Sequence, residues 1–261
     1  MTRLKPLLLA LGLFSTAALA TPLKIGTTAA FAPPLEVAVQ EAKAAGVDVE
    51  IVEFNDWIAP NTSLANHDID ANYYQHIPFL ENAKRNAGYD LVPVAPGILT
   101  NVGLYSKKYK TLAEVPKGAR VAIANDAING GRGLLLLQKA GFITLKPGVG
   151  YHATVADITS NPRDIQIIEV EAVNLARTLD DVDVAQGYPH YLRLANTVDP
   201  SKALLFDGLD HPEYVIQFVA RPDNKDDPRL AKVIDIYQHS PQVKAALDKS
   251  YGKLYLPGWK D

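Results

Sequence analysis

The sequence predicts an α/β fold built as two lobes with a cleft between them. Short apolar runs alternate with segments of helical spacing, which is the pattern of strands layered against helices. Two such series are separated by a polar break at 107–110. The chain has 261 residues, 48% of them hydrophobic and 21% charged, which is enough apolar material for two lobes of about 100 residues each. This composition excludes disorder, collagen and coiled coil.

The first twenty residues have the composition of a secretory signal peptide. Arg3 and Lys5 form a cationic start, 7–14 is an almost unbroken apolar run, and 18–20 (Ala-Leu-Ala) supplies the small residues that signal peptidase requires. The apolar run is shorter than the roughly 20 residues of a membrane-spanning helix. We therefore expect 1–20 to be a signal peptide that is cleaved after Ala20, and a soluble periplasmic product.

The first series of elements begins directly after this segment. Gly46 and Gly88 stand just past helical patterns, and Pro78 stands at the start of one, as is typical of helix ends and beginnings. The expected strands are 23–26, 49–54, 70–74 and 101–106, the expected helices are 35–45 and 78–87, and 27–34 is an expected loop.

The second series follows the polar break. Its expected strands are 119–124, 165–170, 182–185 and 214–220, its expected helices are 134–140, 172–179, 228–238 and 243–250, and 125–131 is an expected glycine-bearing loop. If the terminal helices pack on the first lobe, the strand near Tyr214 is the return crossing. The expected lobe I is then 21–106 plus 211–261, and lobe II is 107–210.

Composition and motifs argue against several classes of function. The absence of cysteine excludes disulfides, thiolate metal sites and cysteine nucleophiles, and leaves no cysteine to carry a lipid. A net charge of −3 argues against a nucleic acid partner. The sequence has no G-x-S-x-G, Walker or H-E-x-x-H motif, and His67 and His76 are too far apart for a local metal motif. We expect no catalytic residue, metal or cofactor, although side chains could still converge from distant positions.

The segment 54–79 is rich in aromatic residues. Trp57, Tyr74 and Phe79 follow or end expected strands, where aromatic rings suit a concave apolar pocket; the alternative is that they are core between strand and helix. Tyr73 and Tyr74 are neighbours on one strand and point to opposite faces. At most one of them is expected to line the cleft.

The segment 125–132 (NDAINGGR) connects a buried strand to a helix. Backbone N–H groups at a helix N-terminus favour an anion, and Arg132 would add a fork that matches a carboxylate. Asn129 is a second candidate ligand-binding residue in the same segment. The alternative for Arg132 is a surface salt bridge.

Four long motifs resemble those of the NlpA family, the methionine-binding lipoproteins of ABC importers. They read FNDWIAPNTSLANHDIDANYYQHIPFLE, PKGARVAIANDAINGGRGLLLLQKAGF, IIEVEAVNLARTLDDVD and RPDNKDDPRLAKVIDIYQ. The resemblance covers essentially all of the chain after residue 20. It implies a periplasmic-binding-protein type II fold, a ligand held between the lobes, and delivery of that ligand to a membrane permease with its ATPase. A monomer is expected.

The resemblance also implies roles for individual residues. Trp57, Tyr74 and Phe79 fall on aromatic positions of the family's side-chain pocket, and His76 falls on its histidine. Arg132 falls on the arginine that grips the ligand carboxylate.

The sequence departs from the family at three positions, two of which bear on the ligand. The lipid-bearing cysteine is absent, Tyr188 replaces a ligand-binding asparagine, and Ile216 replaces a second one. These asparagines help to hold the polar end of an amino acid, so methionine should bind more weakly here unless another group compensates. Glu213 stands where the family usually has proline, so it is the first candidate for a carboxylate that turns inward to compensate, although another carboxylate could do so.

The expected function is an exported solute-binding protein of an ABC importer, for methionine or a related small carboxylate-bearing ligand. Three alternatives remain open. The ligand could be an apolar carboxylic acid without an α-amino group. The chain could be an exported enzyme on the same fold, or an envelope protein that has lost its ligand.

Overall fold

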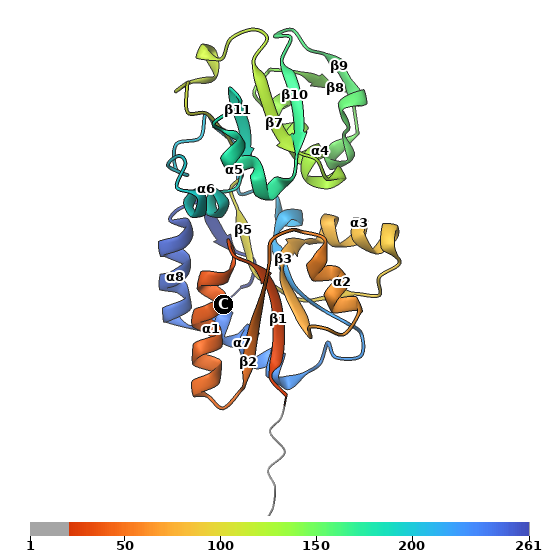
Figure 1. Ribbon diagram of the computed structural model, residues 1–261, viewed down its shortest axis with the longest axis vertical. Helices are drawn as coiled ribbons and strands as arrows, with labels where there is room; N and C mark the ends of the chain where they lie inside the picture. Colours follow the sequence, from red (N-terminus) through yellow and green to blue (C-terminus); the bar gives the residue numbers. More distant parts are fainter. Residues whose placement is uncertain (1–20, 261) are drawn as a thin grey trace, which may run out of the picture.

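The computed structural model describes residues 21–260 and places them in two lobes, one above the other in Figure 1. Each lobe is built on a five-stranded sheet, so the predicted α/β fold of two lobes is confirmed. The predicted signal peptide, 1–20, lies outside the described residues. Within 21–260, every helix is too short or too polar to cross a bilayer.

Lobe I contains both ends of the described chain. Its strands are β1 (Leu23–Thr28), β2 (Val49–Phe54), β3 (Ala71–His76), β4 (Val92–Pro96) and β13 (Ile216–Ala220), in the order β2-β1-β3-β13-β4. Strand β1 is parallel to β2 and β3, and β13 is antiparallel to β3 and β4. Because β13 joins this sheet from late in the chain, we propose that the chain returns to lobe I near Tyr214.

The helices of lobe I lie on both faces of its sheet (Figure 1). On one face are α1 (Ala32–Ala44), α7 (Pro228–His239) and α8 (Pro241–Tyr251), which pack against one another. On the other are α2 (Ala59–Ala65) and α3 (Ile77–Ala87), over a core that includes Leu64 and Leu80. Helix α2 was not predicted from the sequence.

Lobe II repeats the layered arrangement. Its strands are β6 (Gly103–Tyr105), β7 (Arg120–Ala124), β10 (Gln166–Val170), β11 (Val184–Gly187) and β12 (Leu205–Phe206), in the order β10-β7-β11-β6-β12. Helix α4 (Ala127–Lys139) packs over one core cluster, and α5 (Leu175–Thr178) and α6 (Pro189–Ala195) over another. Strands β8 (Thr144–Leu145) and β9 (Ile158–Ser160) form a separate two-stranded sheet at one side of lobe II (Figure 1).

Strand β5 (Ile98–Thr100) carries the chain from lobe I to lobe II, and it pairs with β14 (Tyr255–Pro257) near the C-terminus. Strand β6 follows at once and belongs to the second sheet. We therefore propose that the chain leaves lobe I at about 101–102, and not at 106. The return segment lies between β12 and β13.

The expected loop at 125–131 is mostly helix. Helix α4 begins at Ala127, because Asp126 caps it by accepting hydrogen bonds from the backbone N–H groups of Ile128 and Asn129. Its glycines permit close packing: a Cβ on Gly131 would lie 2.1 Å from the carbonyl oxygen of Tyr151. The sequence pattern suggested that these glycines mark a loop. In the structure they lie inside a helix instead.

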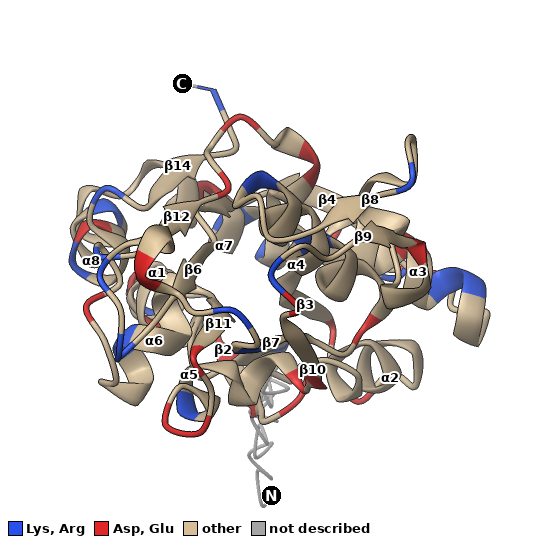
Figure 2. Ribbon diagram, turned by 90° about the horizontal axis from the view of Figure 1, so that it is seen from above, with Lys and Arg blue, Asp and Glu red and all other residues tan. Residues whose placement is uncertain are grey.

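Charged residues of both signs are interleaved over the two lobes. Figure 2 shows Lys and Arg segments alternating with Asp and Glu segments around the rim of the molecule. Several of the ion pairs join exposed partners, such as Lys117 with Asp164 and Lys244 with Asp248. One pair, between Arg132 and Asp207, is buried.

Candidate functional site

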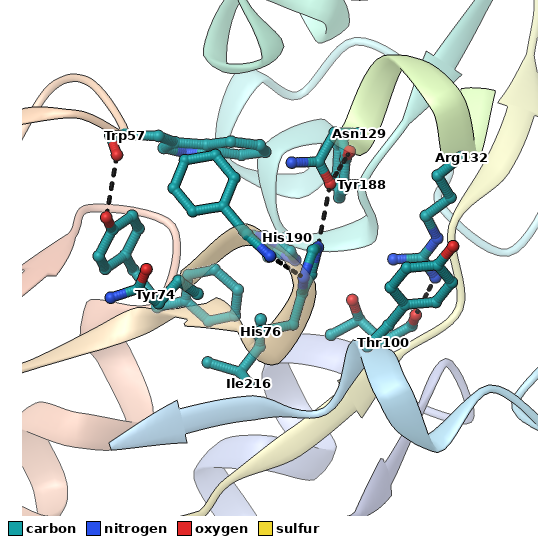
Figure 3. Close-up of a pocket in the computed structure, with 13 residues that line it drawn as sticks. Trp57, Tyr74, His76, Thr100, Asn129, Arg132, Tyr188, His190 and Ile216 are labelled. Carbon is teal, nitrogen blue, oxygen red and sulfur yellow. Dashed lines mark hydrogen bonds between the residues drawn. The ribbon is translucent and has the colours of Figure 1, made fainter. Parts of the chain in front are cut away.

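A small cavity lies between the lobes, and its own side chains nearly fill it: the centre of a water-sized sphere can occupy only about 20 Å³ of it. Its lining residues come from both lobes and are mostly aromatic, and Figure 3 labels nine of them. They are Phe31, Trp57, Tyr74, Gln75, His76, Phe79, Thr100, Asn129, Arg132, Tyr188, His190, Tyr214 and Ile216.

One end of the cavity is aromatic (Figure 3). Trp57 stands in the loop after β2, and its ring is edge-on to Phe79 and to Tyr188, with centroids 6.2 and 5.4 Å apart. The Tyr74 hydroxyl, on β3, donates to the Trp57 carbonyl over 2.9 Å. Tyr73 points the other way, into the lobe I core. The prediction that at most one tyrosine of this pair lines the cleft is confirmed.

The middle of the cavity is a chain of hydrogen bonds between the lobes. His76 caps helix α3: its Nδ1 accepts from the Phe79 backbone N–H, so its Nε2 carries the proton and donates to Asn129 Oδ1 at 3.2 Å. The Tyr188 hydroxyl donates to the same oxygen over 3.0 Å and accepts from Gln186 Nε2. The Tyr188 hydroxyl is therefore occupied by the protein itself.

His76 is neutral in this setting. Burial, together with the nearby positive charge of Arg132, lowers its pKa to about 3. A neutral imidazole with a fixed tautomer holds Asn129 in place at physiological pH. It adds no charge to the cavity.

The lobes are also joined at the aromatic end. Trp57 Nε1, in lobe I, donates to the Tyr191 hydroxyl of α6 over 2.7 Å, and that hydroxyl donates to Thr28 Oγ1. These contacts and the His76–Asn129 bond all span the cleft. The structure is therefore that of a closed form.

Arg132 lies at the other end of the cavity (Figure 3). It is buried in the second turn of α4, so the expected position at the helix N-terminus is wrong, and Asp126 already caps that terminus. Its Nε donates to Asp207 Oδ2 over 2.7 Å, and its Nη2 lies 2.5 Å from the same oxygen. The guanidinium stacks 4.0 Å above the Tyr214 ring.

This pairing changes the electrostatics that the sequence suggested. Arg132 forms neither a surface salt bridge nor an unpaired cation, because Asp207 is its buried counter-ion. Burial raises the pKa of Asp207, and the charge of Arg132 opposes that shift. Among residues 21–260, Nη1 of Arg132 has no hydrogen-bond partner, so this nitrogen remains for a ligand oxygen.

Seven of the eight residues predicted for the site line the cavity: Trp57, Tyr74, His76, Phe79, Asn129, Arg132 and Tyr188. Glu213 does not. It lies in a 3₁₀ turn, Pro212–Tyr214, with its side chain 3.4 Å from His211, so the expectation that it turns inward is wrong. Ile216 lines the cavity and brings no polar atom.

Sequence reasoning missed several lining residues. Thr100 lies on the crossing strand β5, and its carbonyl accepts from Arg132 Nη2 at 3.4 Å. His190 is the second residue of α6, two positions after Tyr188. Strands that connect two lobes border the cleft between them, so the crossing at 98–101 was a signal that could have been used.

A family model described as NlpA lipoprotein matches residues 23–259. The chain belongs to this family. The D-methionine-binding lipoprotein MetQ of Escherichia coli strain K12 is 41% identical over 221 residues, which are 82% of this chain and 79% of that protein.

Solved structures that are similar to this chain show the same fold. The crystal structure of the methionine-binding protein MetQ has a TM-score of 0.87 and 39% identity, over 92% of this chain and 98% of that one. A nutrient-binding protein from Burkholderia cenocepacia, bound to methionine, has a TM-score of 0.85 and 36% identity, over 91% of this chain and 100% of that one. The NlpA-family chain described here is a substrate-binding protein with the two-lobe, type II fold.

Proposed function

We propose that this protein is the exported substrate-binding component of an ABC importer and holds methionine, or a closely related amino acid, in the cavity between its lobes. One observation carries the proposal: the cavity has an available guanidinium nitrogen at one end and a cluster of aromatic rings at the other. A carboxylate fits the first end and a flexible apolar side chain fits the second. Both MetQ and the methionine-bound protein from Burkholderia cenocepacia support this choice of ligand.

Charge balance favours a zwitterion. Arg132 is paired with Asp207, His76 is neutral, and the other lining residues are uncharged, so the closed cavity has no net charge. A zwitterionic amino acid keeps that balance, whereas a simple carboxylate adds one uncompensated buried charge.

A shortage of free acceptors for an ammonium group favours the alternative ligand, a carboxylic acid without an amino group. Ile216 offers no acceptor, and the Tyr188 hydroxyl is already used by Asn129 and Gln186. A ligand without an ammonium group avoids the cost of leaving that group unpaired.

Native mass spectrometry of freshly purified protein identifies any ligand that is retained. Titration calorimetry then compares L-methionine, D-methionine and the des-amino analogue 4-(methylthio)butanoate. We expect methionine to be the tighter ligand. Tighter binding of the analogue would establish the alternative, and no binding of any of the three would overturn the proposal.

The route out of the cell is part of the same proposal. We infer cleavage after Ala20 and an unlipidated mature protein that begins at Thr21 and passes its ligand to a permease with its ATPase. The sequence contains no cysteine to carry a lipid. N-terminal sequencing of periplasmic extracts should start at Thr21. A start at Met1, or recovery only with membranes, would contradict this assignment.

The relatives are substrate-binding proteins, and we infer a binding function without catalysis for this chain too. The side chains that meet in the cavity support this inference. The two histidines among them have no serine or threonine hydroxyl in hydrogen-bond contact, so the site contains no nucleophile–base pair among the described residues.

A further inference from the structure

His190 stands out among the residues that line the cavity. Its imidazole is only 4% exposed, and neither ring nitrogen has a hydrogen-bond partner within residues 21–260. It is one of the residues that line the cavity (Figure 3). No other lining side chain of the described chain has a fully buried nitrogen or oxygen in that state.

Neighbouring aromatic rings fix the position of this imidazole. Phe31 lies 4.2 Å from it between ring centroids, Tyr191 lies 5.0 Å away, and Tyr251 of α8 lies 5.7 Å away. These neighbours hold the ring by packing and leave its nitrogens unsatisfied. Buried polar groups in native proteins normally have partners, so an unsatisfied imidazole at a binding cavity indicates a partner that arrives with the ligand.

The chemistry of His190 complements an amine. Burial and the positive charge of Arg132 keep the imidazole neutral, with its pKa lowered to about 3. A neutral imidazole has one N–H group and one nitrogen that accepts. The acceptor nitrogen can accept a hydrogen bond from a ligand ammonium group at any physiological pH.

Other acceptors in the middle of the cavity are already used. Asn129 Oδ1 receives hydrogen bonds from both His76 and Tyr188. The one acceptor nitrogen of His76 receives the Phe79 N–H. Ile216 supplies none, and Thr100 and Tyr214 contact Arg132 at the other end of the cavity. Among His76, Asn129, Tyr188, His190 and Ile216, only His190 therefore keeps a side-chain lone pair without a partner.

We propose that His190 accepts a hydrogen bond from the α-amino group of the bound amino acid, and that it is the residue by which this site distinguishes an amino acid from its des-amino counterpart. This proposal rests on the function proposed above. It also gives a chain with Tyr188 and Ile216 in its cavity a way to bind an ammonium group.

A cycle that combines a protein change with a ligand change tests the proposal. His190→Phe removes both nitrogens and keeps an aromatic ring against Phe31 and Tyr251. Calorimetry is carried out with wild type and variant, each with L-methionine and with 4-(methylthio)butanoate. We expect His190→Phe to weaken methionine binding by about 10- to 100-fold, the value of one hydrogen bond to a charged group, and to change binding of the analogue by less than about threefold.

Two further variants separate recognition from packing. His190→Asn, which restores a side-chain acceptor, should recover part of the preference for methionine. Tyr188→Phe removes a hydroxyl that contacts only protein groups, so any loss should be equal for the two ligands. Thermal unfolding of the ligand-free His190→Phe variant should show a melting temperature no lower than that of wild type, because the nitrogens contribute no bond to the fold.

The outcomes are distinct. Equal losses for both ligands, or no loss for either, would overturn the role of His190 while the wild type still binds methionine. Failure of the wild type to bind methionine would instead overturn the proposed function, and this proposal with it.

Discussion

Arg132 acts in the fold as well as in the cavity, because its partner Asp207 is almost fully buried. Two contacts of 2.5 and 2.7 Å to one carboxylate oxygen make a tight pair, while the other oxygen, Oδ1, is buried without a partner. Removing one member of such a pair leaves an uncompensated charge inside the protein.

Arg132→Ala should therefore have two effects. Binding of methionine should weaken by about 2–5 kcal/mol, the range for truncating one partner of a buried charged pair. The free energy of unfolding should fall by about 3–5 kcal/mol, because Asp207 is left alone. Urea unfolding and calorimetry measure the two effects separately.

The double variant Arg132→Met with Asp207→Leu is the matched control. It removes both charges, so most of the stability should return while binding stays weak. If Arg132→Ala alone unfolds like wild type, the buried pair is not an important contact in solution.

The two cavity histidines give the protein an acid-sensitive stability. The folded-state pKa of both His76 and His190 is lowered to about 3, whereas the unfolded value is about 6.5. Between these values the unfolded chain binds more protons than the folded one. Stability should be fully present above pH 6.5 and should fall as the pH is lowered towards 3, by up to about 1.4 kcal/mol per pH unit for each histidine.

Denaturant unfolding of wild type and His190→Phe at several values between pH 7 and pH 4 checks this expectation. The variant should lose stability with a shallower slope, since it has one such histidine fewer. Identical slopes would show that His190 does not carry a depressed pKa in the folded protein.

At the scale of elements, helix α4 shows how close packing determines residue choice. Gly130, Gly131 and Gly133 lie in the turns that approach β7, Tyr151 and Gln186. A Cβ at any of them would lie within 3.0 Å of another atom. The short distances hold Asn129 and Arg132, on the same helix, at fixed positions beside the cavity.

Gly131→Ala should be destabilising, although the same change in an exposed helix stabilises by about 1 kcal/mol. The added Cβ would meet the Tyr151 carbonyl oxygen at 2.1 Å, and that backbone atom cannot rotate away. We expect a loss of about 1–3 kcal/mol in the free energy of unfolding, with weaker ligand binding because α4 shifts. A stabilised variant would contradict this packing.

The same helix shows where sequence patterns are informative and where they are not. Apolar runs that alternate with helical patterns, and glycines just past the helix ends, predicted most strands and helices of both lobes to within a few residues. Helices α3 and α7 are examples. Glycines in α4 were interpreted as a loop, because a sequence does not reveal that a neighbouring backbone fills the space of a side chain. Tyr74 and Arg132 were predicted for the site, whereas the Arg132–Asp207 pair joins positions 75 residues apart and has no local signature.

At the scale of the whole molecule, closure depends on a few contacts across the cleft. His76 meets Asn129, Trp57 meets Tyr191, and the ring of His190 packs on Phe31. Each is a polar or aromatic contact of modest strength, so the lobes can separate to admit a ligand and close on it. A bound amino acid would add contacts to both lobes and shift the population towards the closed form.

The fluorescence of Trp57 should report this closure. It is one of only two tryptophans, and its indole is the group that bonds across the cleft to Tyr191, whereas Trp259 packs beside Tyr237 in lobe I. In a Trp259→Phe background, all tryptophan emission comes from Trp57, at the aromatic end of the cavity. Ligand addition should shift that emission to shorter wavelength as the indole leaves water, and rapid mixing would time the movement directly. A spectrum unchanged by a ligand that calorimetry detects would mean that Trp57 stays sealed against Tyr191 in both states.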